Sequence, residues 1–291
     1  MTLSRRLVLG TIASTLALPA LARTPLPVVR RLIAYGNGRD AQPIELEVLL
    51  RGRGPLVVLI ASLGRGASDF DDLAERIARA GFQAAAINPR GVERSRGPAA
   101  KTMDDYAMDV SKTIEALHPG PGGVVLIGHA FGNRVARATA AAYPDRVSGL
   151  ILLASGGQVP IAPNINKALL DVFDVNLTPQ DHMTAVKTAF FAPGNDPDIW
   201  REGWYPAVAM EQRKVLANTP ADRWTGAGSA KMLIIQAADD AIAPPANAEA
   251  LRSAHPDRVT VATIRQAGHA MLPEQPDEIA RIVIERLKRG A

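Results

Sequence analysis

The feature that most restricts the fold of this chain is a regular alternation between short apolar runs and longer amphipathic stretches. The apolar, β-branched runs lie at 56–61, 82–87, 124–127, 147–153, 232–236 and 259–264. Helical patterns separate them at 69–80, 102–118, 131–143 and 245–253, and a last one runs to about Lys288. Because alternating strands and helices build βα units, the pattern predicts an α/β fold with a mostly parallel central sheet flanked by helices. Two earlier runs, 28–35 and 44–50, predict a leading hairpin.

The alternation stops between Gly156 and Gly228, where prolines and short helical stretches replace it. This stretch holds seven aromatic residues, which are Phe173, Phe190, Phe191, Trp200, Trp204, Tyr205 and Trp224. Aromatic side chains bring a large apolar area, so the stretch predicts a helical cap, residues 156–228, over an apolar pocket. Most of these side chains are expected to bury the cap against the sheet, with one or two facing the pocket. The core then comprises residues 23–155 and 229–291.

The composition is that of an ordinary globular protein and excludes two kinds of site. The 291 residues are 47% hydrophobic and 21% charged, which suits a domain with a substantial buried core. Cysteine is absent, so disulfides and thiolate metal sites are excluded, although an oxidising compartment is not. The net charge of +4 falls to +2 without Arg5 and Arg6, and basic and acidic residues alternate in the remainder. A nucleic-acid partner is therefore not expected, because such proteins concentrate their basic residues.

The first 22 residues have the features of an export signal. Residues 4–10, Ser-Arg-Arg-Leu-Val-Leu-Gly, resemble the twin-arginine signature, and an apolar run to Leu18 follows. Small residues at Ala20 and Ala22 fit a signal-peptidase site. The run is shorter than the roughly 20 apolar residues that span a bilayer, and polar residues and Pro19 interrupt it. We therefore expect cleavage after Ala22, no stable membrane insertion afterwards, and a periplasmic or secreted protein.

The most specific motif joins the apolar run at 124–127 to the helical pattern that begins at Phe131. The motif, Gly128-His129-Ala130-Phe131-Gly132, resembles the nucleophile elbow of the α/β-hydrolase family, which is usually G-x-S-x-G between a strand and a helix. The resemblance extends over about 30–155 and 228–288 and implies the α/β-hydrolase fold. It also implies that the middle residue occupies a strained left-handed turn that lifts its side chain above the sheet.

The chain departs from the motif at Ala130, which stands where the family has serine. Alanine has no oxygen with which to attack a carbonyl, so no acyl-enzyme can form at this position. The alanine is either native or a designed Ser→Ala replacement. The retained export signal favours the native residue, as does the stretch 128–137, which resembles relatives with native alanine. His129 and Asn133 are expected to point away from the top of the elbow, and so do not replace the serine.

The family resemblance also supplies an acid and a histidine. Residues 236–244 resemble the turn that carries the acid, which makes Asp240 the expected acid and Asp239 the alternative. Gly268-His269 follows the run at 259–264 and resembles the family's catalytic histidine. Asp240 would then hold one imidazole nitrogen of His269 and leave the other facing the pocket. The other three histidines, His118, His182 and His255, are assigned to structure or surface.

An oxyanion hole is implied at the backbone N–H groups of Phe131 and of Leu63, which follows the first central strand. The glycines at 64 and 66 lack the Walker spacing of a phosphate loop and are interpreted as a tight turn. The segment 88–95 resembles a structural loop of the family, with Asn88 and Glu93 as departures. No metal and no organic cofactor is predicted.

Three functions are compatible with these residues. The first is an enzyme that uses His269 and Asp240 for general-base chemistry on a small, partly apolar substrate, without a serine nucleophile. The second is a conventional serine esterase or hydrolase that is inactive because residue 130 is alanine. The third is a ligand-binding protein that has kept the fold and lost catalysis, and the fold alone does not separate the three. Family resemblance makes hydrolase the preferred class.

Overall fold

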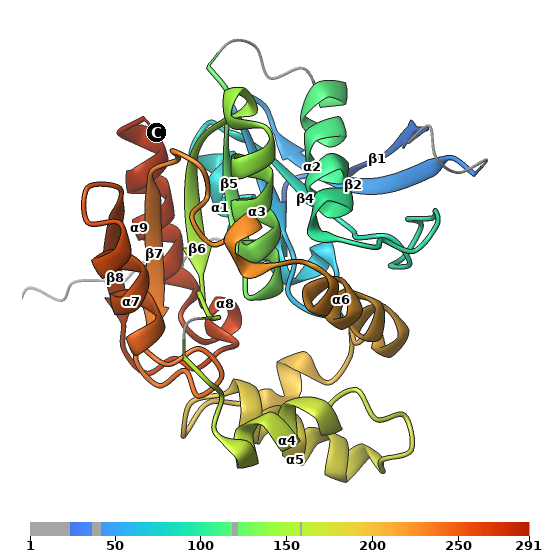
Figure 1. Cartoon of the computed structure of the whole chain (residues 1–291), viewed down its shortest axis with the longest axis vertical. Coiled ribbons are helices and arrows are strands. Elements are labelled where there is room, and N and C mark those ends of the chain that lie inside the picture. The colour runs from blue at the N-terminus through green and yellow to red at the C-terminus, as the bar shows by residue number, and fades with distance from the viewer. Residues whose placement is uncertain (1–23, 37–41, 118–121, 158, 291) are drawn as a thin grey trace, which may run out of the picture.

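A computed structural model describes residues 24–36, 42–117, 122–157 and 159–290, and these form an α/β fold around one sheet. The sheet has eight strands in the order β1-β2-β4-β3-β5-β6-β7-β8 (Figure 1). The strands are β1 (Val29–Tyr35), β2 (Ile44–Gly52), β3 (Leu56–Ile60), β4 (Gln83–Ile87), β5 (Val124–His129), β6 (Val147–Leu153), β7 (Met232–Ala237) and β8 (Val259–Ile264). The predicted export signal, residues 1–22, and His118 lie outside the described residues.

The strand directions confirm the predicted mostly parallel sheet and its leading hairpin. β1 and β2 are antiparallel to each other, and β2 is antiparallel to β4. From β4 to β8 every neighbouring pair is parallel. In a parallel sheet all strands end at the same edge, so the loops after β3, β5, β7 and β8 come together there.

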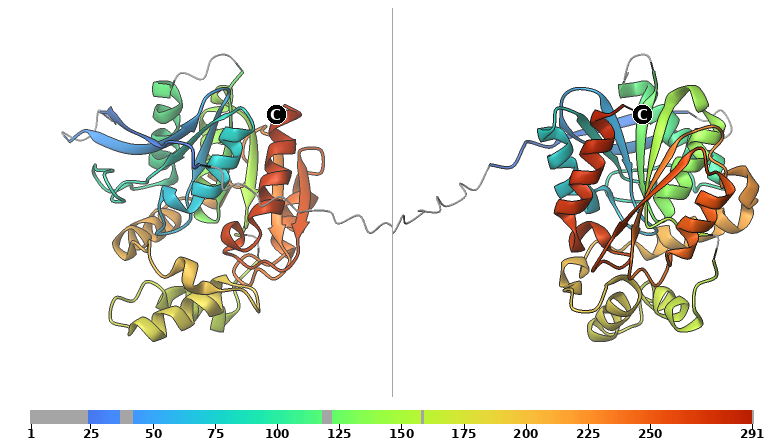
Figure 2. Two further views of the ribbon diagram at one scale, coloured as in Figure 1. Left: turned by 180° about the vertical axis from the view of Figure 1, so that it is seen from behind. Right: turned by 90° about the vertical axis from the view of Figure 1, so that its left-hand side faces the viewer.

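Helices cover both faces of the sheet, as predicted. The first face carries α1 (Asp71–Arg79), α8 (Met271–Glu274) and α9 (Pro276–Lys288), and the second carries α2 (Met103–Leu117), α3 (Phe131–Ala142) and α7 (Ala246–Ala254) (Figure 2). Strand β3 shows why both faces are covered. Its side chains alternate, so Val57 and Leu59 pack with α1 and α9, whereas Val58 and Ile60 pack with α2 and α3. All are buried, which explains the continuous apolar run.

One predicted helix is divided in the structure. The pattern at 69–80 forms a 3₁₀ turn, Ala67–Phe70, followed by α1. The backbone of Phe70, with φ −97° and ψ 5°, leaves the α-helical region and separates the two pieces. The turn is held from outside the helix, because the side-chain oxygen of Asn88 accepts a hydrogen bond from the N–H of Ala67 at 2.7 Å. A sequence pattern does not show such a contact.

Between β6 and β7 the described residues form three α-helices at the end of the sheet where the parallel strands end (Figure 1). These are α4 (Pro163–Asp171), α5 (Pro179–Phe190) and α6 (Pro206–Asn218), and they lie within the predicted cap. Their apolar side chains form a separate cluster with Phe173, Phe191 and Trp200. Among the described residues, no helix has the length and apolar character needed to cross a bilayer.

Arg65 connects this cap to the core. Its guanidinium lies 4.4 Å from the ring centroids of both Trp200 and Trp204. The same guanidinium is paired with Asp69, at 2.6 Å between Nη2 and Oδ1, and donates to the carbonyl of Glu202. Cation–π contacts and a buried ion pair thus fasten the cap helices above the loop that follows β3.

Candidate active site

The loop from β5 into α3 has the geometry that the elbow motif implies. Ala130 adopts φ 50° and ψ −108°, a conformation that is costly for a residue with a Cβ. A Cβ on Gly132 would lie 2.0 Å from the carbonyl oxygen of Ile60, and one on Gly128 would lie 2.3 Å from that of Gly132. Only glycine fits at either position, so both glycines are needed for β3, β5 and α3 to approach so closely.

The histidine and the acid proposed from the sequence are hydrogen-bonded to each other. Nδ1 of His269 lies 2.9 Å from Oδ2 and 3.0 Å from Oδ1 of Asp240. The N–H groups of Ile242 and Ala243 donate to Oδ1 at 2.9 and 2.7 Å, so the carboxylate is held from two sides. Both side chains are buried, whereas the alternative acid, Asp239, is exposed. A carboxylate accepts only, so His269 carries its proton on Nδ1 and its Nε2 is free to accept.

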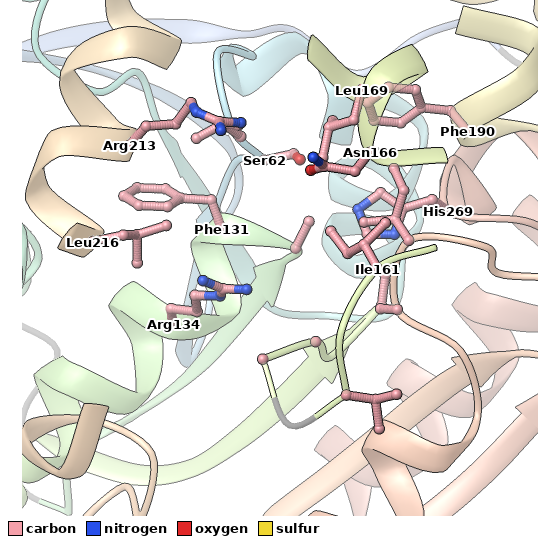
Figure 3. Close-up of a pocket in the computed structure, with 18 residues that line it drawn as sticks. Ser62, Phe131, Arg134, Ile161, Asn166, Leu169, Phe190, Arg213, Leu216 and His269 are labelled. Carbon is pink, nitrogen blue, oxygen red and sulfur yellow. The ribbon is translucent and has the colours of Figure 1, made fainter. Parts of the chain in front are cut away.

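A cavity of about 320 Å³ lies above the elbow, and His269 and Ala130 both line it (Figure 3). Its apolar lining comes from the core and the cap and includes Leu63, Phe131, Ile161, Leu169, Phe190, Leu216 and Ile242. The imidazole of His269 and the methyl group of Ala130 thus face the same cavity. Phe190 is the only one of the seven cap aromatics among its described lining residues, in keeping with the expectation of one or two.

The two residues whose backbone N–H groups are expected to form an oxyanion hole, Leu63 and Phe131, both line the cavity. Phe131 is the first residue of α3, and the N–H of a first helical residue has no partner within the helix. The N–H of Leu63 donates to no described acceptor, whereas that of the next residue, Gly64, donates to Oε1 of Gln212 at 2.7 Å. Gln212 belongs to α6 and is buried, so the cap fixes the loop that carries Leu63.

Two further side chains hold the loop of His269 in place. The carboxylate of Glu274 accepts from the N–H of Gly268 at 2.7 Å, from the N–H of Ala192 at 2.7 Å and from Nδ2 of Asn195 at 2.6 Å. Burial raises the pKa of Glu274, while these three donors lower it. His129 holds the loop from below, since its Nε2 lies 2.8 Å from the carbonyl oxygen of His269. Sequence reasoning had not assigned either role.

The side chains of His129 and Asn133 lie where the sequence analysis expected, away from the top of the elbow. His129 is fully buried, and its ring packs against that of Trp200. Burial, together with the smaller effect of the neighbouring His269, lowers the pKa of His129 to about 3, so the ring is neutral. Asn133 donates to the carbonyl of Ala154 at 3.2 Å and accepts from Arg137 at 2.7 Å.

The segment 88–95 and the remaining described histidines serve the scaffold, as expected. The side chain of Asn88 donates to Glu47, and Oγ of Ser95 donates to the carbonyl of Asn88. The ring of His182 packs against Trp204 in the cap. His255 ends α7 and its Nδ1 accepts from Arg258 at 3.1 Å. None of these groups lines the cavity.

The cavity also has polar lining that sequence reasoning missed. Its polar side chains besides His269 are Ser62, Arg134, Asn166 and Arg213. Arg134 could have been predicted from the sequence, because it follows Ala130 by four residues and so lies on the same face of the helix. The others come from the loop after β3 and from two cap helices, so no local pattern identifies them. Among the described residues, no group of three His, Cys, Asp or Glu side chains could hold a metal ion.

A family model described as "Serine aminopeptidase, S33" matches residues 54–276. The chain is 27% identical over 186 residues to a 2-(acetamidomethylene)succinate hydrolase of Mesorhizobium japonicum, covering 63% of this chain and 62% of that protein. It is 31% identical over 147 residues to a diacylglycerol lipase of Danio rerio, covering 48% of this chain and 44% of the lipase. The chain spans less than two thirds of the length of the three curated relatives it matches.

Among solved structures, an esterase from Thermogutta terrifontis superposes with a TM-score of 0.71 at 25% sequence identity. The superposition covers 90% of this chain and 98% of the esterase. The likeness therefore extends over most of the fold.

Proposed function

Because the chain belongs to the serine aminopeptidase family of α/β-hydrolases, whose model matches residues 54–276, we propose that it is an enzyme that works by general-base catalysis. Its substrate would be a small, partly apolar molecule with an electrophilic carbonyl, and no serine would take part. The observation that carries the proposal is the buried pair of His269 and Asp240, which faces the cavity above Ala130. An imidazole oriented by a carboxylate is a competent base near neutral pH.

The proposed reaction needs a water molecule, the cavity-lining His269, Leu63 and Phe131, and Asp240 behind the imidazole. Nε2 of His269 takes a proton from a water molecule as the water oxygen bonds to the carbonyl carbon of the substrate. The electron pair of the C=O bond moves onto oxygen, where the N–H groups of Leu63 and Phe131 stabilise the negative charge. Collapse of this intermediate expels the leaving group, which takes the proton back from His269. Asp240 stabilises the imidazolium between the two proton transfers.

Without a nucleophile, the expected rate acceleration comes from the base and the oxyanion donors alone. General-base catalysis contributes on the order of 10²–10⁴-fold, and donors to an oxyanion contribute about 10²–10³-fold each. With these two contributions, direct attack by water is fast enough for a slow enzyme. The methyl group of Ala130 occupies less space than a serine side chain, which leaves room for the attacking water beside His269.

The test is turnover of a panel of short-chain and aromatic esters and amides by the native protein and by three variants. H269A removes the base and is expected to abolish turnover, and D240N is expected to lower kcat by about 10²-fold or more. H255A removes a histidine that lies outside the cavity, so its turnover should match the native value. Mass spectrometry of quenched reactions should find no acyl group on the protein. Undiminished turnover by folded H269A, or an acylated native protein, would refute the proposal.

A second candidate function is supported by the conformation of residue 130. Ala130 keeps the φ of 50° although its side chain cannot react, so the elbow retains the shape that presents a nucleophile. A serine hydrolase inactive only because its nucleophile is replaced would have this shape. In that case the native protein binds substrates without turning them over, and a serine at position 130 restores covalent chemistry.

Export is a separate part of the proposal. The twin-arginine segment, the apolar run and the small residues at Ala20 and Ala22 support cleavage after Ala22 and a periplasmic or secreted enzyme. Expression of the full chain in a bacterium, followed by fractionation and N-terminal sequencing, tests this. An intact N-terminus in the cytoplasmic fraction would contradict it.

A further inference from the structure

The cavity contains positive charge that the protein does not neutralise. Arg134 of α3 and Arg213 of α6 extend into it, on the side away from His269 (Figure 3). In the part of the chain that the structure describes, neither guanidinium forms an ion pair with a carboxylate. The described lining residues include no Asp or Glu, so no acid in the wall compensates its two arginines.

A third arginine increases this charge from behind. Arg137 lies one helical turn after Arg134 and is fully buried. Its Nη2 donates to the neutral acceptors Asn133 Oδ1 and Gly156 O, and its Nε and Nη1 have no partner. Burial and, to a smaller extent, the like charge of Arg134 together lower the pKa of Arg137 to about 9, so Arg137 is still protonated at neutral pH. Burial also lowers the pKa of Arg134.

Packing against Trp224 does not balance these charges. Arg134 and Arg137 lie 5.4 and 4.6 Å from the centroid of that ring, and the ring is neutral overall. Buried charges in proteins are normally paired, because an unpaired ion loses its hydration without compensation. Elsewhere this protein follows the rule, since the buried guanidiniums of Arg65 and Arg90 pair with Asp69 and Asp109. The exception is Arg137, which is buried behind the cavity wall, while the half-buried Arg134 and Arg213 lie in the wall itself, where a ligand can supply the missing charge.

We propose that the cavity binds an organic anion, with its charged oxygens at Arg134 and Arg213 and its apolar body along Phe131, Leu216 and Leu169. This rests on the proposed function in taking the cavity as the substrate site. The anionic group would lie on the far side of Ala130 from His269, so the reacting carbonyl belongs between the two ends of the substrate. Asn166 extends into the cavity from α4, near Leu169 and His269 (Figure 3). Guanidinium groups bind carboxylate and phosphate oxygens well because their N–H donors form a planar fork.

The inference is tested by calorimetric binding of matched acid and amide probes, which requires no turnover. Phenylacetate and phenylacetamide have the same apolar body and differ in charge, and phenyl phosphate replaces the carboxylate by a phosphate group. Native protein should bind an anionic probe at least about tenfold more tightly than the amide, as hydrogen bonds to charged groups imply. Tighter binding of phenylacetate identifies a carboxylate site, and tighter binding of phenyl phosphate identifies a phosphate site.

Charge-removing variants locate the site. R134Q and R213Q should each remove most of the preference for the anion while leaving amide binding within about twofold. K214Q is the matched control, because Lys214 is adjacent on α6, is exposed and pairs with Glu211, and its loss should leave the preference unchanged. If R134Q does not fold, R134K keeps the charge without the planar fork and should weaken anion binding several-fold.

Equal affinity of native protein for the acid, the phosphate and the amide would overturn the inference, as would an anion preference that R213Q leaves intact. A Kd above about 10 mM for all three probes would also overturn it, because the cavity has room for each of them. Binding is measured without turnover, so this inference and the proposed function can fail separately. An anion preference lost in R134Q and R213Q, together with undiminished turnover by H269A, would support this inference and refute the proposed function.

Discussion

The imidazole of His129 is hydrogen-bonded to the main-chain carbonyl of His269, at 2.8 Å from Nε2. A carbonyl only accepts, so His129 carries a proton on Nε2. The bond joins the last residue of β5 to the loop that carries the proposed base. The rings of His129 and His269 also lie near each other, with centroids 5.5 Å apart. The position of the base relative to the elbow is therefore set by a side chain that never reaches the cavity.

This arrangement predicts acid sensitivity that originates at His129. Its pKa is lowered from 6.5 to about 3 in the folded protein, chiefly by burial. The unfolded chain therefore binds the proton first as the pH falls below 6.5. Stability contributed by the neutral ring is present above pH 6.5 and is lost, at up to about 1.4 kcal/mol per pH unit, as the pH falls toward 3.

The measurement is urea unfolding of native protein and H129Q at several pH values from 7 to 4. H129Q keeps a donor for the carbonyl of His269 but does not titrate. The free energy of unfolding of the native protein should fall relative to that of H129Q below pH 6.5. Parallel pH profiles for the two proteins would show that His129 is not the source.

The strain at Ala130 predicts that glycine stabilises the protein at this position. Glycine adopts φ 50° without a steric cost, whereas alanine loses about 1–3 kcal/mol there. Glycine also has more entropy in the unfolded chain, so the net gain in the free energy of unfolding for A130G should be about 1 kcal/mol. A217G, at an exposed position in α6, should instead lose about 0.5–1 kcal/mol. Thermal unfolding compares the two, and destabilisation by both would mean that Ala130 is not strained.

A serine at position 130 is predicted to regain covalent reactivity. A130S places a hydroxyl at the top of the elbow, in the cavity that His269 also lines. It should react with a fluorophosphonate probe and give burst kinetics on activated esters, because a serine with an adjacent base is an activated nucleophile. Native protein and the double variant A130S/H269A should stay unlabelled. A folded A130S that remains unlabelled would show that His269 is not positioned to activate a hydroxyl at residue 130.

The contact between Gln212 and Gly64 predicts a role for the cap in the oxyanion loop. Q212A leaves the buried N–H of Gly64 without a partner, which should lower the free energy of unfolding by about 1–3 kcal/mol. It should also lower kcat more than it raises KM, because the loop of Leu63 acts on charge that develops in the transition state. Q180A, at an exposed position in α5, serves as the control for stability. Equal stability of Q212A and Q180A would contradict this assignment.

Much of the fold follows from local patterns. Strand β3 is buried on both faces, and such strands consist of consecutive apolar residues, so its position could be predicted. The division of the helix at Phe70 could not, because Asn88, well separated along the chain, holds the preceding turn. The contacts of Gln212 and Glu274 could not be predicted for the same reason. Gln212 bonds to a residue 148 positions away, and the partners of Glu274 lie between 6 and 82 positions away.

The sequence by itself determined the order of strands and helices, the elbow with alanine at its centre, and the residues proposed as acid and base. These depend on short periodicities and on motifs of a few neighbouring residues. Only the tertiary structure decided that Arg134 and Arg213 meet at one cavity without an acid, and that His129 holds His269. Hydrogen bonding and charge balance depend on every group within a few ångströms, and folding brings those groups together from distant parts of the chain.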